Sequence, residues 1–323
     1  MHRTEPLVSV IIPTINRSEL VVRAVRSALG QTLQAIEVIV VVDGPDEATL
    51  RALRKIEDTR LKVKMLPQNV GQGAAQMAGV QEARGMWVAL LDDDDEWLPQ
   101  KLVLQLQAAQ NSHYPYPIVS CRILARTEVG DCIWPRRLPQ PDEHLSEYLF
   151  CPRTLFEGPV LAPMIQTSTH FARRDFLEKV PIRGMRMVQD VDWLLRANAT
   201  EGVGVEYVST LEPLVVCHFY TADPLGTPLR WRFDNCVSLV QTDRHLITPR
   251  AYASFLMTRA AGLAAQARDF KRVLWCLQEA LRRGRPTPVS SLIYLWIGFV
   301  PLTARRGLSR QYVQWRSLRQ HGA

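Results

Sequence analysis

The sequence lacks the cysteine and histidine spacings of a structural metal site. Its six cysteines are scattered, without a Cys-x-x-Cys pair, and no histidines have the spacing of a zinc finger. We therefore expect reduced thiols in a cytosolic protein. Neither an internal repeat nor a low-complexity tract is present.

Three common catalytic motifs are also missing. There is no GxxxxGK(S/T), no GxGxxG after the first apolar run and no GxSxG. The ATPase, dinucleotide-dependent oxidoreductase and α/β-hydrolase classes thereby lose their main support.

Long apolar runs are lacking near both ends of the chain. The first run, residues 7–12, is short and is followed by Pro13, Asn16 and Arg17, unlike a signal peptide. Residues 292–300 form a continuous apolar stretch that is much shorter than the roughly 20 residues of a spanning helix. We expect residues 289–302 to form a buried helix or one that lies in a membrane interface.

The composition allows a sizeable core and shows an uneven charge. The chain has 323 residues, 47% of them hydrophobic, enough for one large domain or two ordinary ones. Its net charge is +7, yet residues 225–323 hold 16 Lys and Arg against 4 Asp and Glu, an excess of 12 that leaves −5 for the remainder. This basic third either meets a lipid surface, a phosphorylated carrier or nucleic acid, or presents a solvated arginine-rich helical face.

Apolar runs alternate with amphipathic segments through the first hundred residues. Strands are predicted at residues 7–12, 37–42, 61–66 and 86–91, and helices at 18–29, 46–58, 73–85 and from about residue 99. Continuous Val, Ile and Leu runs between helices are typical of strands covered on both faces. The pattern predicts an α/β fold with a mostly parallel sheet flanked by helices.

The middle of the chain is less regular. Residues 114–125 and 131–135 are predicted to pair as antiparallel strands, 164–180 to form a strand and a short helix, 189–199 a helix, and 205–219 two short strands. Beyond Asp223 the pattern is almost entirely helical. We therefore expect a catalytic domain of residues 1–222 and a basic helical C-terminal region of residues 223–323.

Polar clusters follow each of the first four predicted strands. They are "PTINR", "VDGPDE", "PQNVGQG" and "DDDDEW". Ligands of parallel sheets lie beyond the carboxyl ends of the strands, so all four clusters are expected at one edge.

The aspartates at positions 92–95 have two interpretations. Asp95 or Glu96 could cap the helix that follows, within a solvated turn. One cap needs a single carboxylate, however, and four adjacent charges repel one another unless a cation is bound. Hard oxygen ligands favour Mg²⁺ or Mn²⁺, together with substrate phosphates. From the motif alone, the capped turn and the metal–diphosphate site both remain open.

Other polar residues of this edge also have two interpretations. Asp43 could accept N–H bonds from a base or a ribose, or form an Asx-turn before Gly44. Asn69, Gly71 and Gly73 could let a backbone approach phosphates or a base, or simply make a turn.

Two candidates come from later in the chain. Asp190, at the start of a predicted helix, is either a cap or a general base, whereas Asp192 and Arg196 have the spacing of a surface i,i+4 pair. His218 is either a core residue or a ligand or phosphate contact. Its neighbour Cys217 points to the other face of the predicted strand, which argues against a thiol nucleophile.

Three segments carry a resemblance to a known family. Residues 8–45, 69–102 and 167–197 resemble family 2 inverting glycosyltransferases with a GT-A fold, in the right order, and the likeness runs from about residue 6 to 220. The resemblance implies transfer of a sugar from a nucleoside-diphosphate sugar to an acceptor hydroxyl with inversion, and a Mn²⁺ or Mg²⁺ cofactor.

The resemblance also implies roles for individual residues. Thr14 and Asp43 would contact the nucleobase, and Asp190 would be the catalytic base. Asp94 would be the direct metal ligand, with Asp92 and His218 as further candidate ligands. Donor binding would include the following positions: Pro13, Asn16, Arg17, Asn69, Gly71, Asp92 and Asp93.

Three positions depart from the family pattern. Pro45 follows Asp43–Gly44 where relatives have a second carboxylate in "VDDGS", Gln76 stands in place of the arginine of "AARN", and Gln189 replaces the glutamate before the base. The first two bear on the identity of the donor more than on the reaction.

The resemblance further sets the expected partners. A UDP-sugar is the expected donor, with GDP- and dTDP-sugars as alternatives, and the acceptor is a saccharide or lipid-linked molecule. The basic C-terminal region of residues 223–323 could cap the acceptor cleft, contact the inner face of a membrane, or do both, and no nucleic acid partner is expected. The alternatives are a sugar-nucleotide pyrophosphorylase-like nucleotidyltransferase and a non-catalytic nucleotide-sugar-binding module.

Overall fold

The computed structural model describes most of the chain as two compact units. The described residues are 5–128, 130–140, 142–155, 165–184, 188–219, 228–300, 303–305, 307–308 and 311. The first unit takes in residues 1–125 and 165–218, and the second takes in residues 126–164 and 219–323. The predicted boundary between residues 222 and 223 lies outside the described residues.

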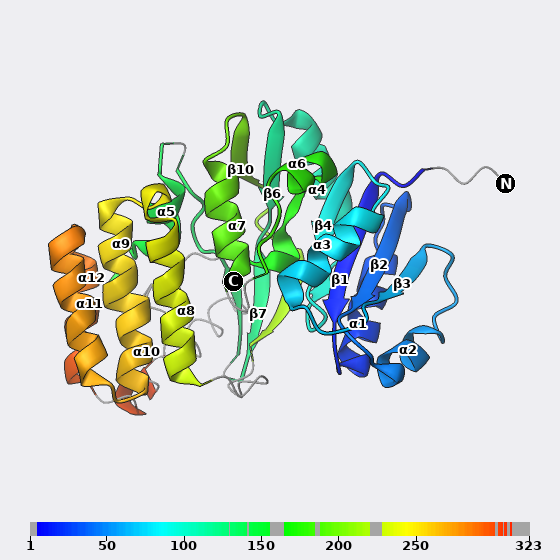
Figure 1. Ribbon diagram of the computed structural model, residues 1–323. Helices are drawn as coiled ribbons and strands as arrows, with labels where there is room; N and C mark the ends of the chain where they lie inside the picture. The colour runs from blue at the N-terminus through cyan, green and yellow to red at the C-terminus, as the bar shows by residue number, and fades with distance from the viewer. Residues whose placement is uncertain are drawn as a thin grey trace. The chain divides into compact units, whose positions relative to one another are not determined.

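The first unit is built on a seven-stranded sheet with the strand order β10-β6-β9-β4-β1-β2-β3 (Figure 1). The strands are β1 (Val8–Thr14), β2 (Ile36–Val42), β3 (Leu61–Met65), β4 (Trp87–Leu90), β6 (Tyr116–Ser120), β9 (Phe171–Arg173) and β10 (Val203–Tyr207). Every pairing is parallel except those of β9, which runs antiparallel to β4 and β6. The predicted α/β fold with a mostly parallel sheet is confirmed.

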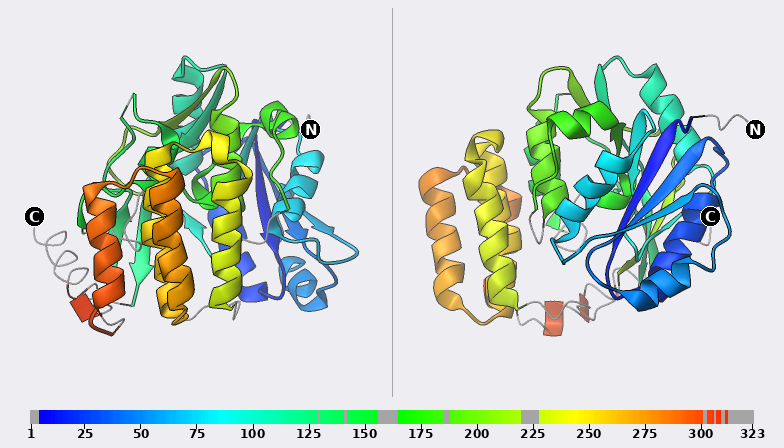
Figure 2. Two further views of the ribbon diagram at one scale, coloured as in Figure 1. Left: turned by 60° about the vertical axis from the view of Figure 1, so that its left-hand side comes forward. Right: turned by 45° about the vertical axis from the view of Figure 1, so that its right-hand side comes forward.

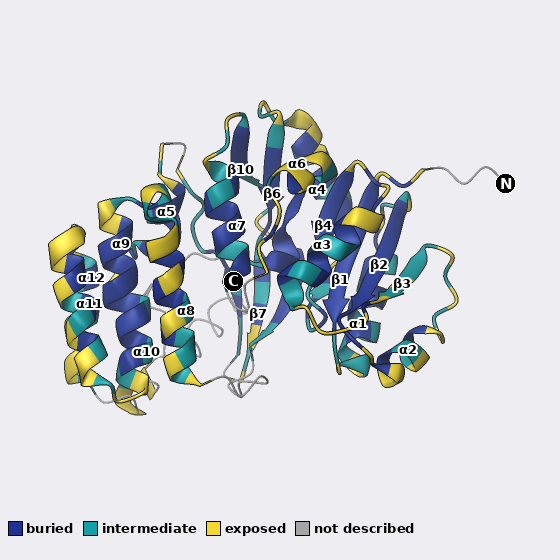
Figure 3. Cartoon of the chain, in the orientation of Figure 1, coloured by how far each residue is buried: buried dark blue, intermediate teal, exposed yellow. Residues whose placement is uncertain are grey.

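Helices cover the sheet where the amphipathic segments predicted them. They are α1 (Ser18–Leu29), α2 (Glu47–Leu53), α3 (Gln72–Glu82), α4 (Lys101–Asn111), α6 (Arg174–Lys179) and α7 (Gln189–Asn198). α1 buries Val21, Ala24, Val25 and Ala28, the i, i+3, i+4, i+7 positions of one helix face. β1 and β2 are buried along their whole length, as Figure 3 shows.

One glycine brings α3 close to the sheet. A Cβ atom at Gly79 would lie 2.4 Å from Ile11 Cγ2 on β1. Only a residue without a side chain therefore allows this separation between helix and strand.

The irregular middle segment differs from its prediction. Residues 114–125 contain two strands, and β6 joins the main sheet beside β10 and β9 instead of pairing with residues 131–135. The second strand, β7 (Ile123–Thr127), belongs to a smaller sheet of order β5-β11-β7-β8 and pairs there with the strand of residues 130–134, so the predicted pairing is confirmed for the end of this segment. Its other strands are β5 (Glu96–Trp97), β8 (Gly130–Trp134) and β11 (Val215–Phe219).

The second unit is mainly helical, as the sequence pattern predicts beyond Asp223. Figure 2 shows its helices in two further views. They are α5 (Leu145–Phe150), α8 (Leu229–Thr242), α9 (Pro249–Phe255), α10 (Ala261–Gln266), α11 (Phe270–Arg283) and α12 (Pro288–Phe299). Within the part of the chain that the structure describes, no helix has the length and apolar character to cross a membrane.

A buried carboxylate on β2 stabilises the sheet in a pH-dependent way. Glu37 accepts hydrogen bonds of 2.7 Å from Ser9 Oγ, from Lys62 Nζ and from the Arg84 backbone N–H. Burial alone would raise the pKa of Glu37, but these bonds outweigh it and lower the pKa from 4.5 to about 2. A carboxyl group with a lowered pKa contributes stability above its unfolded pKa, and this contribution disappears as the pH falls toward the folded value.

We expect Glu37→Gln to lower the free energy of unfolding by about 1–3 kcal/mol near neutral pH. The difference between variant and parent should shrink between about pH 4.5 and pH 2, because the parent is then protonated too. Urea titrations at several pH values measure this. Glu82→Gln is the matched control, since that exposed carboxylate pairs only with Lys64 on the surface. A constant difference across the pH range would contradict the assignment.

Candidate functional site

The four polar clusters predicted at one sheet edge do contact one another. Thr14, the last residue of β1, donates its hydroxyl to Asp93 Oδ2 at 2.7 Å. The Gln72 side-chain amide donates to Asp92 Oδ1 at 2.6 Å. Asp43, after β2, accepts hydrogen bonds from the N–H groups of Val70 and Gly71. The carboxyl ends of β1 to β4 thus form one site, as predicted.

The turn of residues 92–95 concentrates negative charge beside one arginine. Arg17 Nη1 lies 2.8 Å from Asp93 Oδ1 and 3.1 Å from Asp94 Oδ2. Burial would lower the pKa of Arg17, but the charges of Asp93 and its neighbours outweigh burial and raise it. Arg23 donates to the Asp94 backbone carbonyl at 2.6 Å. Asp94 keeps an accessible carboxylate, with 42% of its side chain exposed.

Asp92, Asp93 and Asp95 of this turn have raised pKa values. Burial, followed by repulsion from Asp95, Asp94 and Asp93, raises the pKa of Asp92 well above its ordinary value. Burial also raises the pKa of Asp93, although Thr14 and Arg17 oppose this. Burial is the main cause of these shifts, and the mutual repulsion of the carboxylates adds to it.

Asp95 binds side chains from other segments of the chain and does not cap a helix. It accepts hydrogen bonds from Ser168 Oγ at 2.6 Å and from Cys217 Sγ at 3.2 Å. Burial and the charge of Asp94 raise its pKa to about 7. The predicted cap by Asp95 or Glu96 is wrong, because α4 begins only at Lys101 and Gln100 makes no side-chain cap. The intervening residues form β5 and the turn after it.

Ser168 is a structural residue of the site that the sequence did not reveal. Its hydroxyl accepts the backbone N–H of Asp92 at 3.0 Å while donating to Asp95. Its carbonyl accepts the indole N–H of Trp97 at 2.9 Å. One serine from a segment about 75 positions away therefore fixes both ends of the aspartate turn. A serine between two threonines gave no periodic or motif signal for this role.

Asp190 is delivered to the site by the first turn of α7. Its negative charge contributes to the raised pKa of Asp92, so the two carboxylates lie within electrostatic reach although 98 positions separate them. Asp190 Oδ1 accepts the Val191 N–H at 2.8 Å. The residue before the helix, Val188, has φ +58°, a left-handed conformation that is rare for a β-branched residue.

The expected surface pair on α7 is instead a buried cluster. Asp192 and Arg196 do interact, at 2.8 Å, but Asp192 is buried and also binds Arg183 at 3.1 Å. Trp193 packs beside them against His170 and donates its indole N–H to the Val180 carbonyl. This cluster anchors α7, so Asp190 stands on a fixed element.

Asp43 acts on the turn of residues 69–71 rather than on its own loop. Its two carboxylate oxygens accept hydrogen bonds from the backbone N–H groups of Val70 at 2.8 Å and Gly71 at 2.9 Å. These oxygens therefore bind the turn of residues 69–71 and not an N–H group of the Asp43–Gly44 loop, as an Asx-turn would require. Gly71 has φ +89° and precedes α3, a conformation for which glycine is suited. The space beside Gly73 is filled by the backbone of Arg183, because a Cβ atom at position 73 would lie 2.4 Å from the Arg183 carbonyl oxygen. The expected approach of a phosphate or a base to Gly73 is therefore not possible on this side.

The segment after β1 is fixed by a second aspartate. Asn16 has φ +55°, and its N–H donates to Asp46 Oδ2 at 2.7 Å. Asp46 also caps α2 through the Thr49 N–H. The backbone between Pro13 and Arg17 is thereby held in place beside the aspartate turn.

A family model identifies the chain. The model described as glycosyl transferase family 2 matches residues 9–181, more than half of the sequence. The chain belongs to glycosyltransferase family 2. Its α/β fold is of the GT-A type expected for this family.

Curated relatives of this family 2 chain match about a third of its length. The succinoglycan biosynthesis protein ExoO of Rhizobium meliloti is 38% identical over 104 residues, 32% of this chain and 30% of that protein. Putative teichuronic acid biosynthesis glycosyltransferase TuaG of Bacillus subtilis is 37% identical over 109 residues (33% and 43%). A Campylobacter jejuni GalNAc(5)-diNAcBac-PP-undecaprenol beta-1,3-glucosyltransferase is 35% identical over 122 residues (36% and 39%). The match covers less than half the length of each relative.

Solved structures share the fold at low sequence identity. TarS of S. aureus in complex with UDP-GlcNAc has a TM-score of 0.56 at 17% identity, over 97% of this chain and 92% of that one. Mannosyltransferase PcManGT from Pyrobaculum calidifontis, in complex with GDP-Man and Mn²⁺, has a TM-score of 0.55 at 18% identity (98% and 86%).

Two of the residues that depart from the family 2 pattern are buried in the structure. Gln76, in place of an arginine, is 1% exposed, and neither its amide oxygen nor its nitrogen has a hydrogen-bond partner among the described residues. Gln189, in place of a glutamate, is buried at the first position of α7. The carboxylate expected of a family 2 base remains, on Asp190.

The carboxylates of the turn suit a divalent cation held jointly with a diphosphate. Asp92 and Asp94 offer hard oxygen ligands, and Asp94 is accessible. Burial, followed by repulsion from neighbouring carboxylates, raises the pKa of Asp92. Among the described residues no group of three or more His, Cys, Asp or Glu side chains could hold a metal by itself. Mg²⁺ commonly binds through one or two carboxylates plus substrate phosphates, which matches this donor set.

His218 lies on β11 with its ring directed to a different carboxylate. Its Nε2 lies 3.0 Å from Glu96 Oε1. The metal role of His218 therefore stays a prediction. The neighbouring Cys217 contacts Asp95 and Gln166, and burial together with Asp95 raises the pKa of its thiol well above the ordinary value. This agrees with the expectation that the thiol is not a nucleophile.

Proposed function

We propose that the protein is an inverting glycosyltransferase that moves a sugar from a nucleoside-diphosphate sugar to an acceptor hydroxyl. The observation that carries this proposal is that Asp190 lies within electrostatic reach of the aspartate turn. A base on one element and a diphosphate-binding turn on another are the two parts that such a transfer needs. Membership of glycosyltransferase family 2 supports the same reaction.

The reaction is a single displacement. The acceptor oxygen attacks the anomeric carbon while its proton passes to the Asp190 carboxylate. The bond between the anomeric carbon and the diphosphate oxygen breaks, and its electron pair leaves with the nucleoside diphosphate. Attack from the side opposite the leaving group inverts the anomeric centre.

Asp94 and Asp92 are the proposed ligands of Mn²⁺ or Mg²⁺. When bound, the ion would neutralise negative charge on the departing diphosphate. Arg17, 3.1 Å from Asp94, adds a fixed positive charge beside the same position. The Mn²⁺ complex of PcManGT supports the choice of metal.

The donor is proposed to be a UDP-sugar. TarS is named as a complex with UDP-GlcNAc and PcManGT as a complex with GDP-Man, so nucleotides of both kinds occur on this fold. Thr14 and Asp43 are the proposed nucleobase contacts. Asp43 retains accepting capacity beyond its two backbone bonds, because each carboxylate oxygen has two lone pairs.

The acceptor is proposed to be a saccharide or a lipid-linked saccharide. The curated relatives are named for succinoglycan, teichuronic acid and undecaprenol-linked glycan synthesis. We therefore place the reaction in the synthesis of cell-surface polysaccharide or another glycoconjugate.

Thermal unfolding tests the donor and the metal together. UDP with Mn²⁺ is expected to raise the melting temperature more than either alone, because binding to the folded state adds stability in proportion to the logarithm of ligand concentration. Stabilisation of about 2.7 kcal/mol is expected at 100 times the dissociation constant. GDP and dTDP with Mn²⁺ are the comparisons. If no nucleoside diphosphate gives metal-dependent stabilisation, the proposed donor class is wrong.

A further inference from the structure

One stripe of α12 exposes large apolar side chains to solvent. The stripe consists of Leu292, Leu295, Trp296 and Phe299, and Phe299 is 82% exposed. The i, i+3, i+4, i+7 spacing places these residues on one helix face. Ile293 and Ile297 on the other face are buried. One face of α12 is therefore packed against the protein, and the exposed face is apolar as well.

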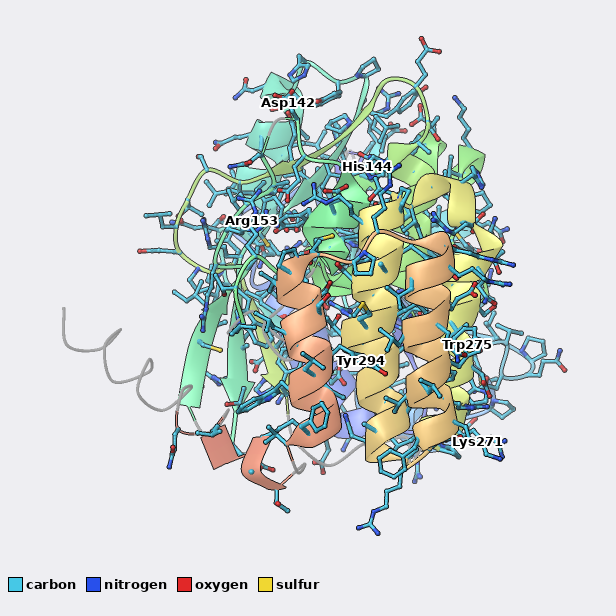
Figure 4. All side chains as sticks on the ribbon, turned by 90° about the vertical axis from the view of Figure 1, so that its left-hand side faces the viewer. Asp142, His144, Arg153, Lys271, Trp275 and Tyr294 are labelled. Carbon is cyan, nitrogen blue, oxygen red and sulfur yellow. The ribbon has the colours of Figure 1, made fainter. Side chains whose placement is uncertain are left out.

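The neighbouring helix α11 extends this apolar surface. Leu274 and Leu281 of α11 are exposed, and the Tyr294 hydroxyl of α12 donates to the Val273 carbonyl at 3.0 Å. Figure 4 looks onto these helices and labels Trp275 on α11 and Tyr294 on α12. We call this surface the α11–α12 face, made up of Leu274, Leu281, Leu292, Leu295, Trp296 and Phe299.

The exposed charges beside the α11–α12 face are all positive. Between residues 268 and 300 the exposed charged residues are Arg268, Lys271, Arg282, Arg283 and Arg285. The two acidic residues of this stretch bind basic neighbours. Asp269 pairs with Arg272 at 3.4 Å, and the buried Glu279 pairs with Arg282 at 3.2 Å and with Arg283 at 3.3 Å. Six basic residues against two acidic ones leave this stretch a net charge of +4, so the face combines apolar side chains with an excess of positive charge.

We propose that the α11–α12 face binds the surface of an anionic lipid bilayer. Apolar side chains on one face of a helix enter the boundary between headgroups and acyl chains, and Lys and Arg attract anionic headgroups. Trp296 has the amphipathic ring typical of that boundary. α12 has 12 residues, about 18 Å of helix, so it would lie in the plane of the bilayer. This inference does not depend on the proposed transfer reaction.

Charge argues against two other occupants. A second copy of the chain, paired about a two-fold axis, would bring the basic residues beside one face against those of the other. Residues 301–323 contain five arginines and no Asp or Glu, so this segment of the chain has no charge complementarity to the face either. An anionic lipid surface can accommodate both the apolar side chains of the face and the basic residues beside it.

Co-sedimentation of the full chain with vesicles tests the proposal. Binding is expected to vesicles of phosphatidylcholine mixed with phosphatidylglycerol, to be weaker with phosphatidylcholine alone, and to fall with added salt. The variant Leu295→Glu/Phe299→Glu should lose binding. Its control is Leu7→Glu/Leu211→Glu, which places the same two charges at exposed leucines of the first unit.

A second variant pair separates charge from apolar contact. Lys271→Gln/Arg285→Gln should weaken binding by roughly 10- to 30-fold, since each basic residue near an anionic surface contributes about fivefold. Arg54→Gln/Lys55→Gln, two exposed basic residues just after α2, is the matched control and should bind as the parent does. Circular dichroism melts establish that all variants remain folded.

Trp296 gives a direct readout of contact with lipid. Vesicles with brominated acyl chains should quench part of the tryptophan emission, and Trp296→Phe should remove that part. Absence of vesicle binding at low salt, or binding that the α11–α12 variants leave unchanged, overturns the proposal. A dimer in analytical ultracentrifugation that Leu295→Glu/Phe299→Glu dissociates, without vesicle binding, also overturns it and assigns the face to a second copy.

Discussion

Asp190→Asn is expected to lower kcat by about 10²–10⁴-fold, the usual contribution of a positioned general base. Asparagine has nearly the same shape, so the Val191 N–H keeps an acceptor at 2.8 Å and α7 should remain in place. The amide cannot take the acceptor proton. The affinity for UDP with Mn²⁺ should therefore change little, and steady-state kinetics beside calorimetry measure the two effects separately.

The control for this variant is Asp175→Asn. Asp175 also stands in the first turn of a helix of the same unit, α6, but pairs with Arg173 on the surface. Its replacement should leave kcat unchanged. Equal losses in both variants, or a loss of nucleotide affinity in Asp190→Asn that matches the loss in kcat, would contradict the assignment of the base.

Asp94→Ala is expected to abolish the metal-dependent part of UDP binding. Loss of an outer-shell residue around a metal typically costs 10–100-fold in affinity, and loss of a direct ligand should cost at least about 100-fold. Binding without metal should not fall, because Arg17 loses one of its two carboxylate partners and becomes more available to phosphate. Isothermal titration calorimetry with Mn²⁺ and with a chelator distinguishes the two parts.

Asp131→Ala provides the comparison for Asp94→Ala. Asp131 has a similar exposure and a single arginine partner, Arg126, at 3.5 Å. Metal-dependent UDP affinity should be the same as in the parent. If Asp94→Ala also retains that affinity, Asp94 is not the metal ligand.

Much of the first unit could be predicted because its elements follow local rules. The Val and Ile runs of β1 and β2 can only be buried strands, and the apolar spacing from Val21 to Ala28 defines α1 within the helix predicted at residues 18–29. The short strand β6 was assigned to the wrong sheet, because its partners β10 and β9 come from segments more than 50 residues later. Strand pairing of this range leaves no local signal.

The sequence indicated which residues belong to the candidate site, but it did not indicate which hydrogen bonds hold them there. The aspartate run and Asp190 stand out by residue type, and the resemblance supplied their roles. The partners of Asp95, by contrast, are Ser168 and Cys217, whose types and surroundings give no indication of a shared contact. Asp192 has the spacing of a surface pair, yet it is buried and binds Arg183 as well as Arg196. Burial of a charge depends on which elements pack together, and local spacing does not contain that information.

Gly73 allows close contact between the helix that holds Asp92 and the segment that leads to Asp190. The first turn of α3 carries Gln72, which holds Asp92, and it rests through Gly73 directly on the backbone of Arg183, in the segment that leads to α7. The helix that holds the proposed metal ligand Asp92 is thus in direct main-chain contact with the segment that precedes the proposed base, Asp190. We expect a single methyl group at position 73 to act as a spacer between these two segments, without altering any residue proposed to take part in the chemistry.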